Sequence, residues 1–326
     1  MVVVGSSAYF KKMFAADAAL IGSLKVVGDN ASFDDYAPAY LDGQSVSGVQ
    51  RKLFMRREGD RLMPAHKDGD FIVKPCPKQF SELPANEYSM MTLASVAGID
   101  TAQHALVPFE DGELCFVTRR FDLLAQPANK KPEPARQRYF IEDAASLCQI
   151  NSKHKGSDAL SYETTLKQLY QCSGANKVVL LKGFQQVLFA YLIGNNDLHL
   201  KNFSMYRKPD DRSTLMRDFT PAYDILSVAP YPAYYGEDLT LCVLASEVDA
   251  EFSDAYEEYG YYTRPDFVLL AEKIGLGATV GERVIQKMIN QVSQNFEKVL
   301  NQSSCSSQLT DALKAHIEER LGRMQR

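Results

Sequence analysis

The sequence has no tryptophan, and its six cysteines stand alone in separate segments without a C-x-x-C pair. Zinc sites and disulfide frameworks need clustered cysteines, so we expect six reduced thiols. No apolar run approaches the roughly 18 residues of a membrane-spanning helix. The first residues, Met1 to Ser6, lack the charged region and the long apolar stretch of a secretory signal peptide. We therefore expect a cytoplasmic protein that does not contact a membrane.

The chain also lacks an excess of positive charge. Its net charge is -5 and its isoelectric point is near 5.6, which argues against nucleic acid as a primary ligand but leaves a local basic patch open. Hydrophobic residues make up 45% and charged residues 24%, as in an ordinary soluble protein. A length of 326 residues suits one large two-lobed domain or two small ones.

Apolar patterning changes along the chain. The first third predicts short strands around one helix, and the later part predicts long helices. The strands are expected at 53–55, 71–74, 105–108 and 114–118, and the helices at 85–97, 181–193, 265–276, 281–301 and 308–323. Residues 9–28 suit a helix or two, and the proline-rich 125–138 suits a linker. We predict an α+β, two-lobed fold like that of protein kinases, with an N-lobe at 1–123 and a helical C-lobe at 124–326.

The strongest motif is Asn195-Asn196-Asp197-Leu198-His199-Leu200-Lys201-Asn202. Asp197 and Asn202 have the spacing of a kinase catalytic loop, in which the Asp orients the attacking hydroxyl and the Asn holds magnesium. Asp224 follows in the order of a second metal-binding carboxylate. Three such oxygen donors can hold a hard divalent cation against the phosphates of ATP. His199 either contacts phosphate or Asp197, or it braces the loop as a core histidine.

Further candidates lie in the strand-rich part. Lys74 ends the strand Phe71-Ile72-Val73, where kinases place the lysine that grips the α- and β-phosphates. Glu87 either pairs with Lys74 or only complements the dipole of its helix. Residues 44–52 form a small-residue loop with one glycine that could approach phosphate. Residues 119–122 suit either a hinge at the adenine or a surface turn. The many tyrosines of 223–262 suit ordinary packing.

These residues together resemble the HipA family of serine kinases, and more specifically the short HipT kinases of three-gene HipBST toxin–antitoxin systems. The resemblance covers the chain from about residue 36 onward. It rests on Ser-Val-Ser-Gly-Val-Gln-x-Lys at 45–52, Phe-Ile-Val-Lys-Pro at 71–75, Asn-Glu-Tyr at 86–88, Arg-Arg-Phe-Asp at 119–122, Glu-Asp at 142–143, Gly-Asn-Asn-Asp-Leu-His-Leu-Lys-Asn-Phe at 194–203 and Tyr-Asp-Ile-Leu-Ser-Val-Ala-Pro-Tyr-Pro at 223–232.

The resemblance implies a role for each matching residue. Asp197 would be the catalytic residue, and Asn202 and Asp224 would hold Mg²⁺. Autophosphorylation would fall on Ser45 and Ser47. The implied contacts to ATP come from the phosphate loop, the strand lysine, the hinge and the catalytic loop: Ser47, Gly48, Val49, Gln50, Arg51, Lys52, Lys74, Arg119, Arg120, Phe121, His199, Lys201 and Tyr223.

The family also implies a function and partners. The chain would be a Mg-ATP-dependent kinase toxin that phosphorylates an aminoacyl-tRNA synthetase, tryptophanyl for the short kinases, and so arrests translation. A small antitoxin resembling the missing N-terminal subdomain and a DNA-binding antitoxin would be its partners, and DNA would be met only through the latter. We expect residues 1–30 to contact the small partner through Phe10, Met13, Phe14, Leu20 and Ile21, unless these side chains pack on the chain's own core.

Two other functions remain open. The chain could be a HipA-like kinase secreted as an effector into host cells. It could also be a pseudokinase scaffold in a DNA-bound repressor complex, which would require loss of the catalytic or metal-binding residues. Asp197, Asn202 and Asp224 are all present.

Overall fold

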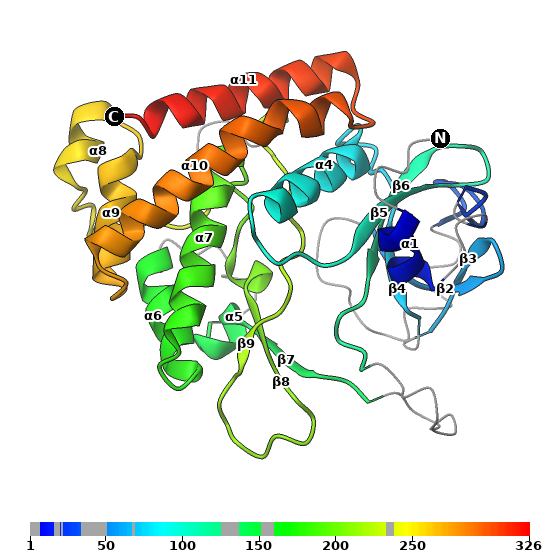
Figure 1. The fold of residues 1–326 in the computed structure, drawn as a ribbon, viewed down its shortest axis with the longest axis horizontal. Helices are drawn as coiled ribbons and strands as arrows, with labels where there is room; N and C mark the ends of the chain where they lie inside the picture. Colours follow the sequence, from blue (N-terminus) through cyan, green and yellow to red (C-terminus); the bar gives the residue numbers. More distant parts are fainter. Residues whose placement is uncertain are drawn as a thin grey trace. The chain divides into compact units, whose positions relative to one another are not determined.

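The computed structural model describes residues 7–15, 20, 22–33, 51–66, 69–124, 137–150, 160–232 and 238–326. The chain forms two compact units (Figure 1). The first comprises Met1–Ser89, Ala102–Gln137 and Gln302–Ser306, and the second comprises Met90–Thr101, Arg138–Asn301 and Ser307–Arg326. The first is rich in strands and the second in helices, which confirms the predicted α+β fold. Helix α4 (Leu83–Val96) is shared by the two units, and the predicted lobe boundary at 123/124 stays a prediction.

The described residues of the first unit form helix α1 (Ser7–Phe14) and a six-stranded sheet in the order β1-β3-β2-β4-β6-β5. The strands are β1 (Lys25–Val26), β2 (Leu53–Glu58), β3 (Arg61–Pro64), β4 (Phe71–Lys74), β5 (His104–Pro108) and β6 (Leu114–Arg119). All neighbours are antiparallel except β1 and β3. A parallel bridge between Val26 and Phe109 also joins the β1 and β5 ends. The four predicted strands are confirmed. Strand β3 was not anticipated, and neither was β1, which lies in the segment 9–28 that was expected to be helical.

Helix α1 belongs to the hydrophobic core of the first unit. Phe10, Met13 and Phe14 are at most 2% exposed and pack with side chains of the sheet such as Phe71 and Val107. The expectation that these three anchor a separate partner is therefore wrong, because the apolar side of the helix is already buried within its own unit. Leu20 is exposed, and Ile21 lies outside the described residues.

The polar side of α1 forms hydrogen bonds with the sheet. The Tyr9 hydroxyl accepts a hydrogen bond from the His104 amide at 2.7 Å and donates one to the His104 carbonyl at 3.0 Å. His104 lies on β5, an end strand of the sheet. These two bonds satisfy a donor and an acceptor that β6, on the other side of β5, does not reach.

Helices dominate the second unit. They are α5 (Ala144–Leu147), α6 (Tyr162–Cys172), α7 (Lys177–Ile193), α8 (Asp254–Tyr259), α9 (Arg264–Lys273), α10 (Ala278–Asn301) and α11 (Ser307–Arg323), with 3₁₀ turns η2 (Leu200–Asn202) and η4 (Ala245–Asp249). On α10, Ile285, Met288, Val292 and Phe296 recur every three or four residues and are buried, which is why this segment forms an amphipathic helix. The predicted helices at 181–193, 265–276, 281–301 and 308–323 are confirmed.

A three-stranded sheet in the order β7-β8-β9 also lies in the second unit. It consists of β7 (Phe140–Asp143), β8 (Ser204–Arg207) and β9 (Asp218–Phe219). The sequence did not predict this sheet because its strands have only two to four residues, too few for an alternating pattern. It is important for the site, since β8 begins directly after the Asp197–Asn202 motif and β9 ends shortly before Asp224.

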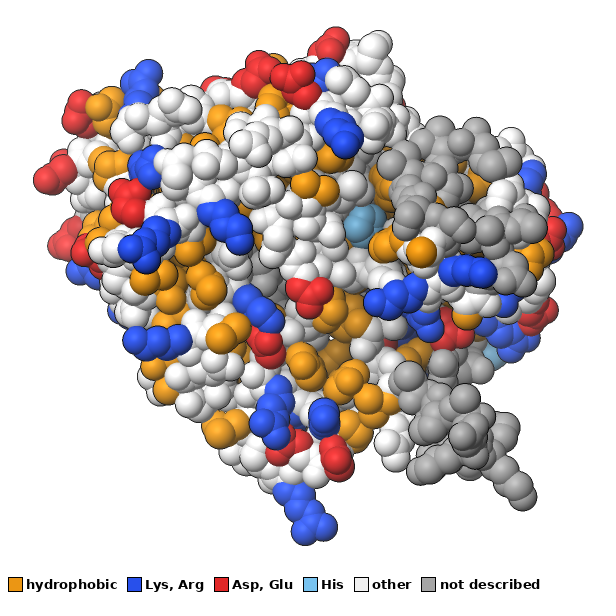
Figure 2. Space-filling model, viewed as in Figure 1, with side chains coloured by type: hydrophobic (Ala, Val, Ile, Leu, Met, Phe, Trp, Pro, Cys, Tyr) orange, Lys and Arg blue, Asp and Glu red, His pale blue; other side chains and the backbone are white. Residues whose placement is uncertain are grey.

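The charged side chains and the cysteines are distributed as the composition suggested. Positive and negative side chains are interspersed on the face shown in Figure 2. All six cysteines are free. Across the residues that the structure describes, no helix is both long enough and apolar enough to cross a membrane.

Candidate functional site

The Asp197 motif forms a loop between α7 and β8. Helix α7 ends at Gly194, whose φ of 69° is left-handed and therefore suits glycine. The Asn195 side chain then accepts a hydrogen bond from the Asp197 amide at 3.2 Å. The Asp197 carbonyl accepts bonds from the His199 amide at 2.8 Å and from Asn202 Nδ2 at 2.9 Å. The loop backbone at Asp197 is thus held by both ends of the motif.

The segment that leads to Asp224 is tied to this loop at its two ends. The Thr220 amide donates to the Ser204 carbonyl at 2.8 Å, and the Val228 amide donates to the Gly194 carbonyl at 3.0 Å. Between them, Asp224 has a φ of 58°, an uncommon backbone conformation for a residue with a side chain. Strained backbone is concentrated at functional sites. The structure therefore brings the segments of Asp197, Asn202 and Asp224 together.

Tyr223 and Tyr162 brace the loop. The Tyr223 hydroxyl donates to the Lys201 carbonyl at 2.8 Å and shares a 2.6 Å hydrogen bond with Ser204 Oγ. The buried Tyr162 on α6 donates to the Leu198 carbonyl at 2.8 Å, and this burial raises the pKa of its phenol. Sequence analysis missed Tyr162, because an isolated tyrosine in a helix carries no local signal. His199 is buried at the start of η2, and Lys201 is half-buried.

The donor set of this loop fits a magnesium ion. Asn202 uses its Nδ2 within the loop, so its amide oxygen is the atom left for a metal. Asp197 and Asp224 supply carboxylates. The described ranges contain no group of three or more His, Cys, Asp or Glu side chains that could hold a metal alone. Magnesium is commonly held by one or two carboxylates together with substrate phosphates and water, rather than by protein ligands alone. A small set of oxygen donors such as this one therefore suits magnesium.

In the first unit, Lys74 and Glu87 form a buried ion pair. Lys74 Nζ lies 2.6 Å from Glu87 Oε1, and the two side chains are 8% and 0% exposed. Lys74 ends β4, and Glu87 lies in the first half of α4. The ammonium also lies 5.5 Å from the centre of the Phe116 ring. Of the two interpretations of Glu87, pairing with Lys74 is the one that the structure shows.

The expected hinge residues are largely engaged within the first unit. The amides of Arg119 and Arg120 donate to the carbonyls of Gln103 and Asp70, both at 2.8 Å. The Arg120 guanidinium bonds Asp122 and the Gly69 carbonyl, and the Arg119 guanidinium donates to the Lys12 carbonyl. The contact of this segment with adenine stays a prediction.

The expected phosphate loop is described only at its end. Arg51 donates to the Asn30 side chain at 2.5 Å and to the Cys76 carbonyl at 3.2 Å, so its side chain is held within the first unit. Lys52 is half-buried just before β2. The remaining expected residues, Ser45, Ser47, Gly48, Val49 and Gln50, lie outside the described residues.

The chain is similar in sequence to a known protein family and to proteins named as kinases. The family model described as HipA-like C-terminal domain matches residues 44–300. A Haemophilus influenzae protein named "Putative kinase" is 32% identical over 274 residues, which cover 80% of this chain and 75% of that protein. The serine/threonine-protein kinase toxin HipA of Shewanella oneidensis is 27% identical over 236 residues, which cover 67% of this chain and 49% of the toxin.

A solved structure shows a similar fold. HipA from the Shewanella oneidensis toxin–antitoxin complex with HipB and operator DNA superposes with a TM-score of 0.65 and 22% identity. The match covers 86% of this chain and 64% of that HipA chain. The chain thus spans about half to two thirds of the HipA proteins to which it is compared.

Proposed function

Because this chain belongs to the family of HipA-like C-terminal domains, we propose that it transfers the γ-phosphoryl group of ATP to a serine or threonine of a protein. The observation that carries the proposal is the joined arrangement of the Asp197–Asn202 loop and the Asp224 segment. The names of its relatives as kinases support the same reaction.

The chain's residues then take distinct parts in the reaction. Asp197 orients the acceptor hydroxyl and takes its proton as the oxygen attacks the γ-phosphorus and the bond to the β–γ bridging oxygen breaks, which releases ADP. Asn202 and Asp224 would hold Mg²⁺, which would neutralise charge on the phosphates. Lys74, oriented by Glu87, neutralises the α- and β-phosphates. Asn195 and Tyr162 keep the loop in place.

We extend the proposal to the biological role. The kinase would act in the cytoplasm as the toxin of a toxin–antitoxin system, with an aminoacyl-tRNA synthetase, tryptophanyl first, as its substrate and with autophosphorylation at Ser45 or Ser47. A DNA-binding antitoxin is supported by the relative solved with HipB and operator DNA. The net charge of -5 agrees with a chain that meets DNA only through such a partner. A small second antitoxin is part of the same proposal.

The test measures phosphate transfer from radiolabelled ATP to purified synthetases and to the chain itself. Asp197→Asn and Asp224→Ala should each lower the rate by at least about 10²-fold, because positioning and charge stabilisation carry this chemistry. Asp311→Asn, an exposed carboxylate on α11, is the matched control and should transfer normally. Transfer at the normal rate by either loop variant would reject the assignment.

A further inference from the structure

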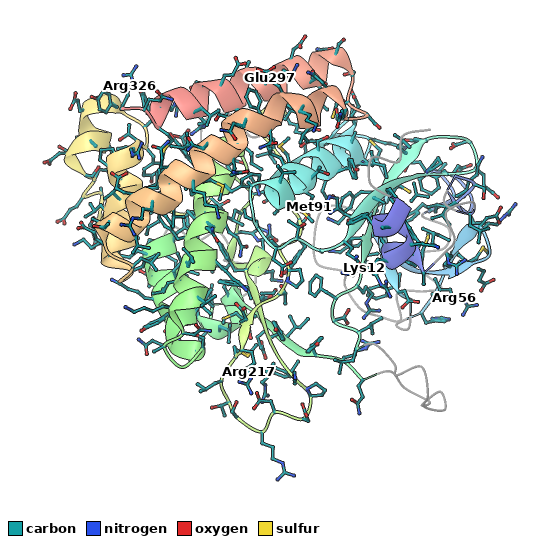
Figure 3. All side chains as sticks on the ribbon, in the orientation of Figure 1. Lys12, Arg56, Met91, Arg217, Glu297 and Arg326 are labelled. Atoms are coloured by element: carbon teal, nitrogen blue, oxygen red, sulfur yellow. The ribbon has the colours of Figure 1, made fainter. Side chains whose placement is uncertain are left out.

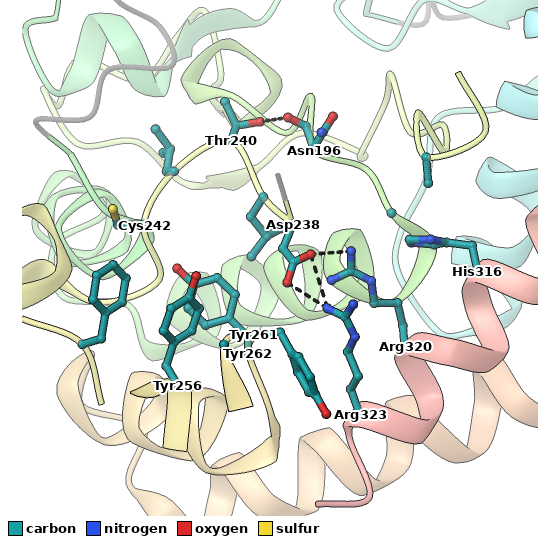
Figure 4. Close-up of a pocket in the computed structure, with 16 residues that line it drawn as sticks. Asn196, Asp238, Thr240, Cys242, Tyr256, Tyr261, Tyr262, His316, Arg320 and Arg323 are labelled. Atoms are coloured by element: carbon teal, nitrogen blue, oxygen red, sulfur yellow. Dashed lines mark hydrogen bonds and ion pairs between the residues drawn. The ribbon is translucent and has the colours of Figure 1, made fainter. Parts of the chain in front are cut away.

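The peptide group that joins Asn196 to Asp197 is hydrogen-bonded at both of its polar atoms. The Thr240 hydroxyl donates to the Asn196 carbonyl (Figure 4), and the Asp197 amide donates to the Asn195 side chain at 3.2 Å. Because a peptide group is planar, bonds at its oxygen and at its nitrogen together fix its orientation. Thr240, which lies outside the catalytic motif, therefore helps to set the direction in which Asp197 leaves the backbone.

The segment 238–243, which carries Thr240, is held at its start by two arginines of α11. Asp238 accepts from Arg320 at 2.6 Å and from Arg323 at 3.0 Å, so one carboxylate serves two guanidinium groups (Figure 4). Arg320 is only 5% exposed. Loss of its partner would leave a buried charge uncompensated, which is costly. The start of the segment is therefore held firmly against α11.

The end of the same segment is held by α6. The amides of Tyr162 and Glu163 donate to the carbonyls of Cys242 and Val243, at 2.8 Å and 3.1 Å. The Tyr162 hydroxyl also donates to the Leu198 carbonyl at 2.8 Å. The first turn of α6 thus fixes both the segment and the catalytic loop, so that the segment cannot shift at this end without a change at the loop.

On one side, the segment faces a cavity instead of packed side chains. The cavity has a volume of about 620 Å³ and is lined by residues 238–242, residues 252–262, the start of the Asp197 loop and α11 (Figure 4). An unfilled space supplies no van der Waals contacts to its walls. The placement of Thr240 thus depends more on the polar contacts of its segment than it would in a fully packed site.

From these contacts, we propose that Thr240 is a positioning residue for Asp197, and that Asp238, through its two arginines, keeps Thr240 in place. The inference rests on the proposed function, in which Asp197 orients the acceptor hydroxyl. Loss of the Thr240 hydroxyl removes the hydrogen bond that this residue gives to the Asn196 carbonyl and frees the peptide group to turn. A displacement of about 1 Å at a reacting group can lower a rate by about 10²-fold.

The first test compares three threonine variants. Thr240→Val keeps the shape of the side chain but not its hydroxyl, and should lower kcat at least about tenfold with KM for ATP within about twofold of the wild-type value. Thr240→Ser, which keeps the hydroxyl, should retain at least about half of the wild-type kcat. Thr165→Val is the matched control, because Thr165 is fully buried on α6 and its hydroxyl has no hydrogen-bond partner among the described residues. Phosphate transfer from radiolabelled ATP, with the acceptors used for Asp197→Asn, gives both constants.

The second test asks whether Asp238 acts through Thr240. Asp238→Asn should also lower kcat, and the double variant Asp238→Asn/Thr240→Val should lose no more rate than the more impaired single variant. Glu282→Gln, which removes a carboxylate paired with Arg264 at a more exposed position, is the matched control. Thermal unfolding of each variant establishes that it folds.

Hydrogen–deuterium exchange of the amides at 197–202 reports on the loop without any reaction. It should be at least about tenfold faster in Thr240→Val than in the wild-type chain or in Thr165→Val. Unchanged kcat in folded Thr240→Val, or an equal loss in Thr240→Ser or Thr165→Val, would overturn the positioning role. Additive losses in the double variant would reject the part given to Asp238. A chain that transfers no phosphate, yet shows the faster exchange, would instead reject the proposed function and leave the hold of Thr240 on the loop standing.

Discussion

The buried pair of Lys74 and Glu87 offers a sharp test of how the first unit combines stability with function. The two charges are 2.6 Å apart and almost completely removed from water. Desolvation makes such a pair costly to bury, and removal of one partner leaves the other charge uncompensated. Lys74→Met should therefore lower the free energy of unfolding by about 3–5 kcal/mol, and Glu87→Gln should lower it by a similar amount.

The double variant Lys74→Met/Glu87→Leu separates the pair from its surroundings. Replacement of a buried pair by apolar side chains is often neutral, because no charge remains to be desolvated. We expect the double variant to be more stable than Lys74→Met alone. With Glu87→Leu as the second single variant of the cycle, the coupling energy should then exceed about 3 kcal/mol. Urea unfolding without nucleotide, followed by fluorescence of the tyrosines, measures each free energy.

A surface pair in the same unit is the matched control. Arg56 and Glu58 on β2 are 2.7 Å apart, close to the 2.6 Å of the buried pair, but their side chains are 53% and 51% exposed. Arg56 is labelled in Figure 3. Glu58→Gln should cost about 0–1 kcal/mol. If the buried pair shows additive single changes, or no larger a cost than the exposed pair, our account of the burial is refuted.

Among the Lys74 and Glu87 variants, the rate of phosphoryl transfer should not vary in parallel with the free energy of unfolding. The double variant should recover stability yet lack phosphoryl transfer, because no cation remains at position 74 to neutralise the ATP phosphates. Recovery of both together would show that Lys74 acts only as a structural ion-pair partner. The proposed nucleotide contact would then be wrong, whereas the proposed role of Asp197 would not be affected.

Further predictions concern other parts of the chain. Incubation with Mg-ATP should add phosphate to Ser45 or Ser47, detected by intact-mass spectrometry, and an unchanged mass in an enzyme that phosphorylates a substrate would contradict this. Burial lowers the pKa of His104 to about 4, below the ordinary 6.5, so the unfolded chain binds a proton that the folded chain excludes. The free energy of unfolding should fall by roughly 3 kcal/mol as the pH drops from about 6.5 to about 4, less so in His104→Gln. Gly194→Ala should lower stability by at least about 1 kcal/mol, because of its left-handed φ and the close His316 ring, and wild-type unfolding curves would contradict this.

Local patterns predicted the elements that are long or sharply bounded. Helix α7 was predicted because apolar residues repeat through it and Gly194 ends it, and β4 because Lys74 follows an apolar run. The Asp197–Asn202 motif was visible because these two residues are five positions apart. Contacts between distant residues had no such signal. Tyr162 reaches Leu198 across 36 positions, and the Lys74–Glu87 pair depends on how α4 meets the sheet.

The N-terminal segment shows what amino-acid composition alone cannot predict. Phe10, Met13 and Phe14 suit either a partner surface or an internal core, because both environments select apolar side chains. Only the packing of α1 on the sheet distinguishes them. The cavity that Tyr256 and Tyr261 line together with helix α11 was missed for a related reason. The two tyrosines have ordinary helix and turn contexts, and α11 lies about 60 residues later in the chain.

The two hydrogen bonds between Tyr9 and His104 have a consequence for association between molecules. An end strand with free amides and carbonyls can recruit a strand from another chain and begin aggregation. Tyr9 occupies both groups of His104 on β5, and the helix that carries it fills the core beneath. Helix α1 therefore protects the sheet from intermolecular pairing, and a chain shortened past Phe14 would lose that protection together with part of its core.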